Sequence, residues 1–176
     1  ETAFIPFKKC YGKQMNDVEI LKKIEKKVLW LACWMIHNAN HIRENQDGLK
    51  VGGHQASSAS IVSIMTALYF SILRPEDRVA VKPHASPVFH AIQYLSGLQT
   101  KEKIENFRGF GGAQSYPSRT KDIDDVDIST GSVGLGVAMT SFISLIQDYI
   151  ARKQFYKNKP LGRMIALVGD AELDEG

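Results

Sequence analysis

The sequence predicts an α/β domain, with a central parallel sheet flanked by helices. Two short apolar segments, residues 78–82 and 164–168, have the length of strands, and helical patterns lie between them. Strands separated by helices are typical of parallel sheets. The second segment is apolar throughout and stops at Gly169 and Asp170, as expected of a strand buried on both faces. Because ligands of such sheets bind beyond the carboxyl ends of the strands, Asp170 stands where a ligand is expected.

Composition limits the class of protein. The 176 residues are 44% hydrophobic, which is enough for one domain with a core. The net charge of +3 is too balanced to favour nucleic acid or a membrane as a partner. The lysines at 22, 23, 26 and 27 are expected to form a solvated helix face. Cys10 and Cys33 lie far apart without a CxxC spacing, and no signal peptide is visible, so reduced thiols in a cytoplasmic protein are expected.

Apolar periodicity and capping residues predict the elements in order. Residues 1–16 are expected to form an N-terminal arm, and residues 17–176 the domain. Helices are predicted at residues 17–43 (capped by Asn16), 58–73, 86–95 (starting at Ser86 and Pro87), 100–107 and 134–153. Residues 108–130 are expected to be irregular, and loops of that length are usually functional or disordered.

Three of these helices have apolar stripes that we expect to face the core. The first stripe is Val18, Leu21, Ile24, Val28, Leu31 and Met35. The second is Ile61, Ile64, Met65, Leu68 and Ile72, and the third is Leu135, Ala138, Met139, Phe142, Ile146 and Tyr149.

Glycines at positions 131, 134 and 136 open the last predicted helix. Backbone N–H groups at a helix start, unblocked by side chains, can bind an anion such as phosphate. Their order does not match the dinucleotide fingerprint, and the sequence has no GxxxxGK[ST] motif, so neither a Rossmann NAD site nor a P-loop is expected. Glycine at a helix start is also explained by chain geometry alone.

His54 and His84 each lie where the chain leaves a packed element. Such positions supply ligand contacts, and histidine can donate, accept or transfer a proton near neutral pH. The alternative is that both are loop histidines hydrogen-bonded to backbone.

The remaining titratable clusters favour structural roles. His37 and His41 have a spacing that could hold zinc, but no HExxH pattern or nearby cysteine supports a metal. His90 lies among apolar neighbours and is expected to be structural. The aspartates at 122, 124, 125 and 127 lack the glycine of a calcium loop, so a solvated acidic loop is expected.

Five segments occur in an order that resembles one known family. They read GGHQASSASI at 52–61, KPHASPVFHAIQYLSG at 82–97, NFRGF with QSYP at 106–117, GSVGLG at 131–136 and GDAELDEG at 169–176. They resemble the diphosphate-binding half of transketolase-like, thiamine-diphosphate-dependent enzymes. Within that family they are most similar to the homodimeric decarboxylating component of the pyruvate dehydrogenase complex. The resemblance implies the thiamine-diphosphate-binding fold.

The resemblance also implies roles for matching residues. Asp170 is expected to bind Mg²⁺, which holds the cofactor diphosphate, and that site is expected to be lined by Gly169, Ala171 and Glu172. The aminopyrimidine and neighbouring parts of the cofactor are expected to contact Gly131, Ser132 and Val133. His54 and His84 are expected to face the thiazolium carbon as catalytic residues that manage protons and oxyanion charge, with Ser57 close by.

Two residues depart from the family pattern. Ala171 replaces the last glycine of GDG, and Lys82 replaces a small or polar residue. The resemblance also implies that the remaining metal ligands and a pyrimidine-binding domain lie outside these 176 residues, so the domain is expected to be truncated at its C-terminal end.

The expected function is decarboxylation of a 2-oxo acid, with pyruvate favoured, by a homo-oligomer that uses thiamine diphosphate and Mg²⁺. Two alternatives stay open. One is a transketolase that transfers ketol groups between sugar phosphates. The other is a degenerate, non-catalytic cofactor-binding module.

Overall fold

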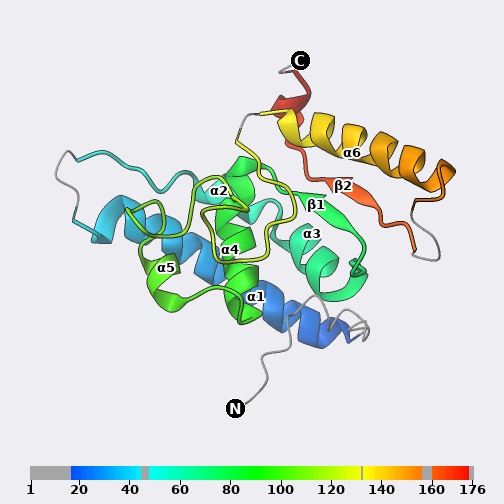
Figure 1. Ribbon diagram of the computed structural model, residues 1–176. Coiled ribbons are helices and arrows are strands. Elements are labelled where there is room, and N and C mark those ends of the chain that lie inside the picture. Colours follow the sequence, from blue (N-terminus) through cyan, green and yellow to red (C-terminus); the bar gives the residue numbers. More distant parts are fainter. Residues whose placement is uncertain (1–16, 45–47, 132, 156–159, 175–176) are drawn as a thin grey trace, which may run out of the picture.

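The computed structural model of the chain describes residues 17–44, 48–131, 133–155 and 160–174. The predicted N-terminal arm, the predicted cap Asn16 and the candidate residue Ser132 therefore lie outside the described residues. Within them, the chain forms a mixed α/β structure with helices α1–α6 and strands β1 and β2. Figure 1 shows α6 on one side of the two strands and the other helices on the opposite side.

The strands β1 (Arg78–Ala80) and β2 (Met164–Ala166) pair in parallel, with Val79 opposite Ile165. The N–H of Leu167 donates to the carbonyl of Ala80 at 2.9 Å and continues the ladder by one bond. The parallel pairing predicted from the two apolar segments is confirmed. Each strand is shorter than predicted, because β1 ends before residues 81–82 and β2 before residues 167–168.

Side chains of β1 alternate between two layers, as in any strand. Val79 and Val81 enter the main hydrophobic core together with residues of α1 (Val18–His37), α3 (Val62–Ala67) and α4 (Ser86–Leu95). Ala80 faces the opposite layer, where α6 (Leu135–Arg152) crosses the strands. A Cβ on Gly136 would lie only 3.2 Å from the Cβ of Ala80, so the glycine lets α6 approach β1 closely.

Helix α1 begins and ends differently from the prediction. Asp17 is its N-cap, and its Oδ1 accepts hydrogen bonds from the N–H groups of Glu19 at 2.9 Å and Ile20 at 3.3 Å. The α-helix ends at His37 and continues as a π-helical turn, Asn38–Ile42. Of the predicted stripe, Val28 and Met35 are buried, whereas Val18 in the first turn is 59% exposed.

Two predicted short helices agree with the structure in position. Helix α4 has the predicted bounds, although Ala85 and not Ser86 occupies the N-cap. Helix α5 (Lys101–Glu105) begins where Thr100 caps it, with Oγ1 accepting from the N–H of Lys103 at 3.3 Å.

The single helix predicted at 58–73 is wrong in detail. The chain forms α2 (Gln55–Ala59), then α3, then a π-helical turn at Leu68–Ile72. Because the helix is broken at Ser60 and Ile61 and widened at its end, a single 3.6-residue period does not describe its buried face. Of the predicted stripe, Ile61, Met65 and Leu68 are buried, whereas Ile64 is 58% exposed and Ile72 is 44% exposed. Val62 and Tyr69 are buried in addition.

The face predicted to be buried in α6 is also wrong. Its largest members, Phe142, Ile146 and Tyr149, are more than half exposed, Leu135 is 41% exposed, and Ala138 is exposed as well. The helix instead turns Gly136, Thr140 and Ile143 toward the strands. Gly136 on that face permits the close crossing over Ala80, and this favours it over the bulkier stripe.

The acidic loop is not solvated, contrary to the prediction. His90 is fully buried, and its Nδ1 lies 2.7 Å from Oδ2 of Asp124 while its Nε2 lies 2.8 Å from the carbonyl oxygen of Gln114. Oδ1 of Asp122 accepts the N–H of Gln114 at 3.1 Å. The carbonyl of Gln114 and an ionised Asp124 carboxylate both accept hydrogen bonds, so this arrangement favours a ring that is protonated on both nitrogens. His90 is structural, as predicted.

This ion pair makes stability depend on pH. Burial opposes the charge on His90, but the hydrogen bond and charge of Asp124 outweigh it and raise the pKa of His90 above 6.5. The pair therefore stabilises the fold fully below about pH 6.5, and this contribution is lost as pH rises through the raised pKa. We expect the free energy of unfolding in urea to fall over that range, and Asp124→Asn to flatten the dependence. An unchanged pH slope in Asp124→Asn would contradict a charged His90.

A second buried carboxylate, that of Asp77, connects the residues that precede the two strands. Asp77 is 3% exposed, and its Oδ2 lies 2.5 Å from a terminal guanidinium nitrogen of Arg163. Its oxygens also accept the backbone N–H groups of Arg163 at 2.8 Å and Arg74 at 2.9 Å. Burial opposes ionisation of Asp77, but the hydrogen bonds from Arg163 outweigh it and lower the pKa to about 2.

Replacing Asp77 with asparagine is expected to lower the free energy of unfolding by about 2–3 kcal/mol, because Arg163 loses its anionic partner. The depressed pKa means that the contribution is present above pH 3.8 and is lost as pH falls toward about 2. Urea denaturation at neutral pH measures the loss, with Asp148→Asn on the exposed face of α6 as the matched control. Equal stability of the two variants would show that the pair contributes nothing.

Two further observations concern the described cysteine and the possibility of a membrane-spanning helix. Cys33, which the structure describes, is a free cysteine, and burial raises the pKa of its thiol. Over the described part of the chain, none of the helices combines the length and the apolar character needed to span a bilayer.

Candidate functional site

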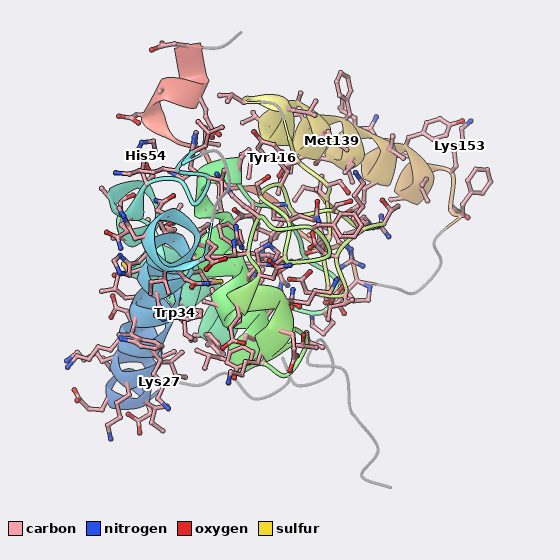
Figure 2. The ribbon with its side chains drawn as sticks, turned by 90° about the vertical axis from the view of Figure 1, so that its left-hand side faces the viewer. Lys27, Trp34, His54, Tyr116, Met139 and Lys153 are labelled. Carbon is pink, nitrogen blue, oxygen red and sulfur yellow. The ribbon has the colours of Figure 1, made fainter. Side chains whose placement is uncertain are left out.

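A cavity of about 620 Å³ lies where the loops following β1 and preceding α2 and α6 meet the irregular loop after α5. Its walls are formed by Lys50, Val51, Gly53, His54, Pro83, His84, Arg108, Ser115, Tyr116, Gly131 and Val133. Four predicted site residues, His54, His84, Gly131 and Val133, are therefore brought to one cavity. Figure 2 shows His54 and Tyr116 at the same end of the molecule, far from Lys27.

The π-helical turn after α1 holds the backbone before His54. The side-chain Oδ1 of Asn40 accepts the N–H of Gly52 at 2.6 Å, and its Nδ2 donates to the carbonyl of Gly53 at 3.1 Å. A Cβ at position 52 would lie 2.5 Å from the carbonyl oxygen of Ile36, and Gly53 has φ +85°. Both glycines are therefore required by this geometry, which directs His54 to the cavity at the start of α2.

His84 lies in the 3-10 turn Pro83–Ala85, just after β1. The buried Ser58 fixes this turn, because its Oγ donates to the carbonyl of His84 at 3.2 Å. Ser57 lines a recess of about 10 Å³ that His54, His84 and Arg108 also line. The predicted neighbours of the cavity histidines are thus assembled from α2 and the end of β1.

The glycine-rich turn before α6 is tied to β1. Thr130, which precedes it, donates from Oγ1 to the carbonyl of Val81 at 2.7 Å. Gly134 is the N-cap of α6, with φ +80° and no side-chain hydrogen bond to the first turn. Within the described part of the chain, no side chain is therefore seen to cap the backbone N–H groups at the start of α6, as the anion-site interpretation requires.

The predicted metal ligand lies beside this turn and does not line the cavity. Asp170 and Ala171 are exposed in the 3-10 turn Asp170–Asp174, which follows β2. The N–H of Gly169 donates to Oε2 of Glu172 at 2.7 Å, and Glu172 shares a small recess with Lys82 and Gly134. The acidic turn after β2 and the glycine turn before α6 are therefore neighbours, as a shared diphosphate site requires.

The sequence interpretation missed several cavity residues. Lys50, Arg108, Ser115 and Tyr116 line the walls, although no role was assigned to them. Arg108 and Tyr116 belong to the NFRGF and QSYP segments, so the family resemblance contained the signal for both. Lys50 lies in a turn-rich stretch that carries no such signal.

No protein-family model matches the chain. The chain is, however, similar in sequence to several bacterial proteins named pyruvate dehydrogenase E1 component. That of Pseudomonas aeruginosa is 30% identical over 175 residues, which cover 93% of this chain and 19% of that protein. That of Buchnera aphidicola subsp. Schizaphis graminum is 27% identical over 169 residues, or 91% of this chain and 18% of the relative. The protein of Escherichia coli K12 is 26% identical with the same coverage.

The structure defines a mixed α/β domain with a histidine-lined cavity beyond the end of a parallel strand pair. The comparisons then give its relationship: the chain is homologous to a segment of pyruvate dehydrogenase E1 components, which confirms the resemblance found in its motifs. It spans less than a fifth of the length of these relatives.

Proposed function

We propose that this chain forms the diphosphate-binding part of a thiamine-diphosphate- and Mg²⁺-dependent enzyme that decarboxylates a 2-oxo acid, with pyruvate as the favoured substrate. The similarity to pyruvate dehydrogenase E1 components across at least 91% of the chain in each relative described carries the proposal. The cavity supports it, because two histidines and two residues of the glycine turn line one space. A thiamine-diphosphate-binding fold, a homo-oligomeric state and a cytoplasmic location belong to the same proposal.

The residues present fit part of such a site. The carboxylate of Asp170 is exposed after β2, and oxygen ligands of this kind are those that Mg²⁺ prefers. The uncapped start of α6 offers N–H groups to a phosphate, next to the acidic turn. In this proposal Asp170 holds the metal, Gly169, Ala171 and Glu172 line the diphosphate, and Gly131, Ser132 and Val133 contact the aminopyrimidine region.

Thiamine diphosphate, when bound, supplies the carbanion chemistry that side chains lack. The role of this chain is then to orient substrate and cofactor and to move protons. His54 and His84 are the candidates for proton transfer and for stabilising oxyanion charge, because both residues line the cavity and come from two different segments. Ser57, beside both histidines, is placed to support them.

One observation favours the non-catalytic alternative. Ala171 stands where the family has glycine, and the carboxylate of Glu172 already accepts the N–H of Gly169. A carboxylate beside a phosphate repels it unless a metal or a cation lies between them. In the catalytic proposal, Mg²⁺ on Asp170 and the nearby ammonium of Lys82 compensate for this charge.

The test uses the natural protein that contains this sequence. Its affinity for thiamine diphosphate is measured by calorimetry with and without Mg²⁺. Turnover is then measured with pyruvate and an artificial electron acceptor, and separately with xylulose 5-phosphate and ribose 5-phosphate. We expect Mg²⁺-dependent binding and pyruvate-dependent reduction of the acceptor. Ketol transfer without pyruvate turnover would establish the transketolase alternative, and failure to bind the cofactor would establish the non-catalytic module.

A further inference from the structure

The side chain of Arg108 is held in the cavity wall by a hydrogen bond and a ring contact. One terminal nitrogen of its guanidinium donates to the carbonyl of Val51 at 2.7 Å, and its central carbon lies 5.3 Å from the ring centroid of Phe107. Its Nε is buried and has no hydrogen-bond partner among the described residues. The guanidinium thus has donors that the described part of the fold does not use.

The charge of Arg108 also lacks an anionic partner. It forms no ion pair with any residue that the structure describes. Among the described residues that line the cavity, Lys50 is a second cation and none carries a carboxylate. Burial lowers the pKa of Arg108, which reflects the removal of its charge from water. A half-buried cation without an anion is costly, so the cavity is electrostatically suited to an anionic ligand.

The backbone at Arg108 is held in an unfavourable conformation. Its φ is +59°, in the left-handed region that residues with a branched or bulky side chain rarely occupy. The conformation is imposed by a tight turn, in which the N–H of Arg108 donates to the carbonyl of Ala113 at 2.9 Å. Arg43 braces the same turn by donating to the carbonyl of Phe107 at 2.8 Å. Strain of this kind persists where the surroundings enforce it, and it clusters at functional sites.

We propose that Arg108 binds the carboxylate of the 2-oxo acid, with Lys50 adding positive charge to the same cavity. This inference rests on the proposed function and identifies the residue that selects the substrate. A guanidinium matches a carboxylate with two parallel N–H···O bonds, which a lysine ammonium cannot reproduce. Substrate bound in this way shares the cavity with His54 and His84.

A purely structural role is the competing explanation, because Arg108 also braces the carbonyl of Val51 beside the His54 turn. Arg108→Gln separates the two roles, since glutamine retains an N–H donor and removes the charge. Arg108→Lys retains the charge and removes the planar guanidinium with its parallel N–H donors. Arg119→Gln is the matched control, because Arg119 is an exposed arginine of the same loop that does not line the cavity.

Three measurements are made on each variant of the natural protein. The first is the affinity for thiamine diphosphate with Mg²⁺. The second is kcat and KM for pyruvate. The third is equilibrium binding of pyruvate, of its uncharged amide pyruvamide and of ribose 5-phosphate to the cofactor-free protein, followed by ligand-observed NMR. The thermal unfolding midpoint identifies any variant that fails to fold.

We expect Arg108→Gln to raise the KM and the dissociation constant for pyruvate roughly 10- to 100-fold, as for loss of a charge-assisted pair. In Arg108→Gln, the affinities for the cofactor and for pyruvamide stay within a factor of about three of the wild-type values. Arg119→Gln matches the wild type in every measurement. Arg108→Lys gives a smaller increase. If Arg108→Gln weakened the binding of pyruvate and of pyruvamide equally, the role of Arg108 would be purely structural, and the inference would be overturned.

The binding measurement keeps this inference separate from the proposed function. Pyruvate binding that depends on Arg108, without turnover, supports the inference and contradicts the proposed activity. If the protein binds ribose 5-phosphate but not pyruvate, Arg108 is assigned to a phosphate group. That result overturns the proposal that Arg108 binds the substrate carboxylate. If Arg108→Gln does not fold, an unchanged pyruvate KM in Arg108→Lys overturns the proposal, and an increase confined to pyruvate supports it.

Discussion

Replacing His54 or His84 with alanine is expected to reduce kcat for pyruvate turnover by about 100- to 1000-fold, the range expected for loss of a proton-transferring group. The structural reason is that both residues line the cavity, whereas Asn40 holds the backbone of Gly53, just before His54, and Ser58 holds that of His84. Alanine should therefore remove the imidazole and leave the fold in place. Steady-state kinetics and a thermal unfolding curve measure the two effects on the natural protein.

The matched control for the histidine variants is His41→Ala, since His41 is an exposed histidine that does not line the cavity. Equal activity of His54→Ala and His41→Ala would remove His54 from the catalytic assignment. A glutamine at position 54 or 84 retains a hydrogen-bond donor but cannot transfer a proton at neutral pH. Recovery of full activity in His84→Gln would therefore indicate a positioning role for that residue.

The second large effect is expected at Asp170. Asp170→Ala should weaken Mg²⁺-dependent binding of thiamine diphosphate by about 100-fold, which corresponds to roughly 2.7 kcal/mol. Asp170 is the exposed carboxylate that begins the turn after β2, and Mg²⁺ usually takes only one or two protein carboxylates. Calorimetry with and without Mg²⁺ separates loss of the metal from loss of direct cofactor contacts.

Asp148→Ala controls for removal of an exposed negative charge elsewhere on the protein. Because Asp170 lies on the surface, the free energy of unfolding without ligand should change by no more than about 0.5 kcal/mol. A dissociation constant that is the same for Asp170→Ala and wild type would mean that the metal is held elsewhere, and the assignment of Asp170 would be withdrawn.

Much of the fold could be predicted because strands and helix starts have strong local signals. The apolar segments around Val79 and Ile165 predicted their parallel pairing, and Pro87 marked the start of α4. The orientation of α6 could not be predicted, because this helix has apolar residues on more than one face. Periodicity favoured the face with Phe142, whereas contact with the strand selected the face where Gly136 permits a close approach to Ala80.

The site was predictable to the extent that its residues lie at ends of elements. His54 and His84 follow this rule and line the same cavity. Arg108 also follows a predicted helix, but nothing in the sequence indicates that this arginine is held at positive φ or that it lines the cavity. Asp122 and Asp124 appeared as solvated charges for a related reason: their partner, His90, is distant in sequence and only the tertiary fold pairs them.

The side chain of Asn40 has a chemical consequence of its own. Its amide acts like a peptide group of a neighbouring strand, giving one N–H to Gly53 and receiving one from Gly52. Hydrolysis of this amide to a carboxylate, the usual ageing reaction of asparagine, retains the acceptor but removes the donor. Two oxygens then face each other across the 3.1 Å that separates Nδ2 from the Gly53 carbonyl. Deamidation at residue 40 would thus release the segment that carries His54. Activity should therefore decline during storage in proportion to the deamidation of Asn40, although Asn40 does not line the cavity.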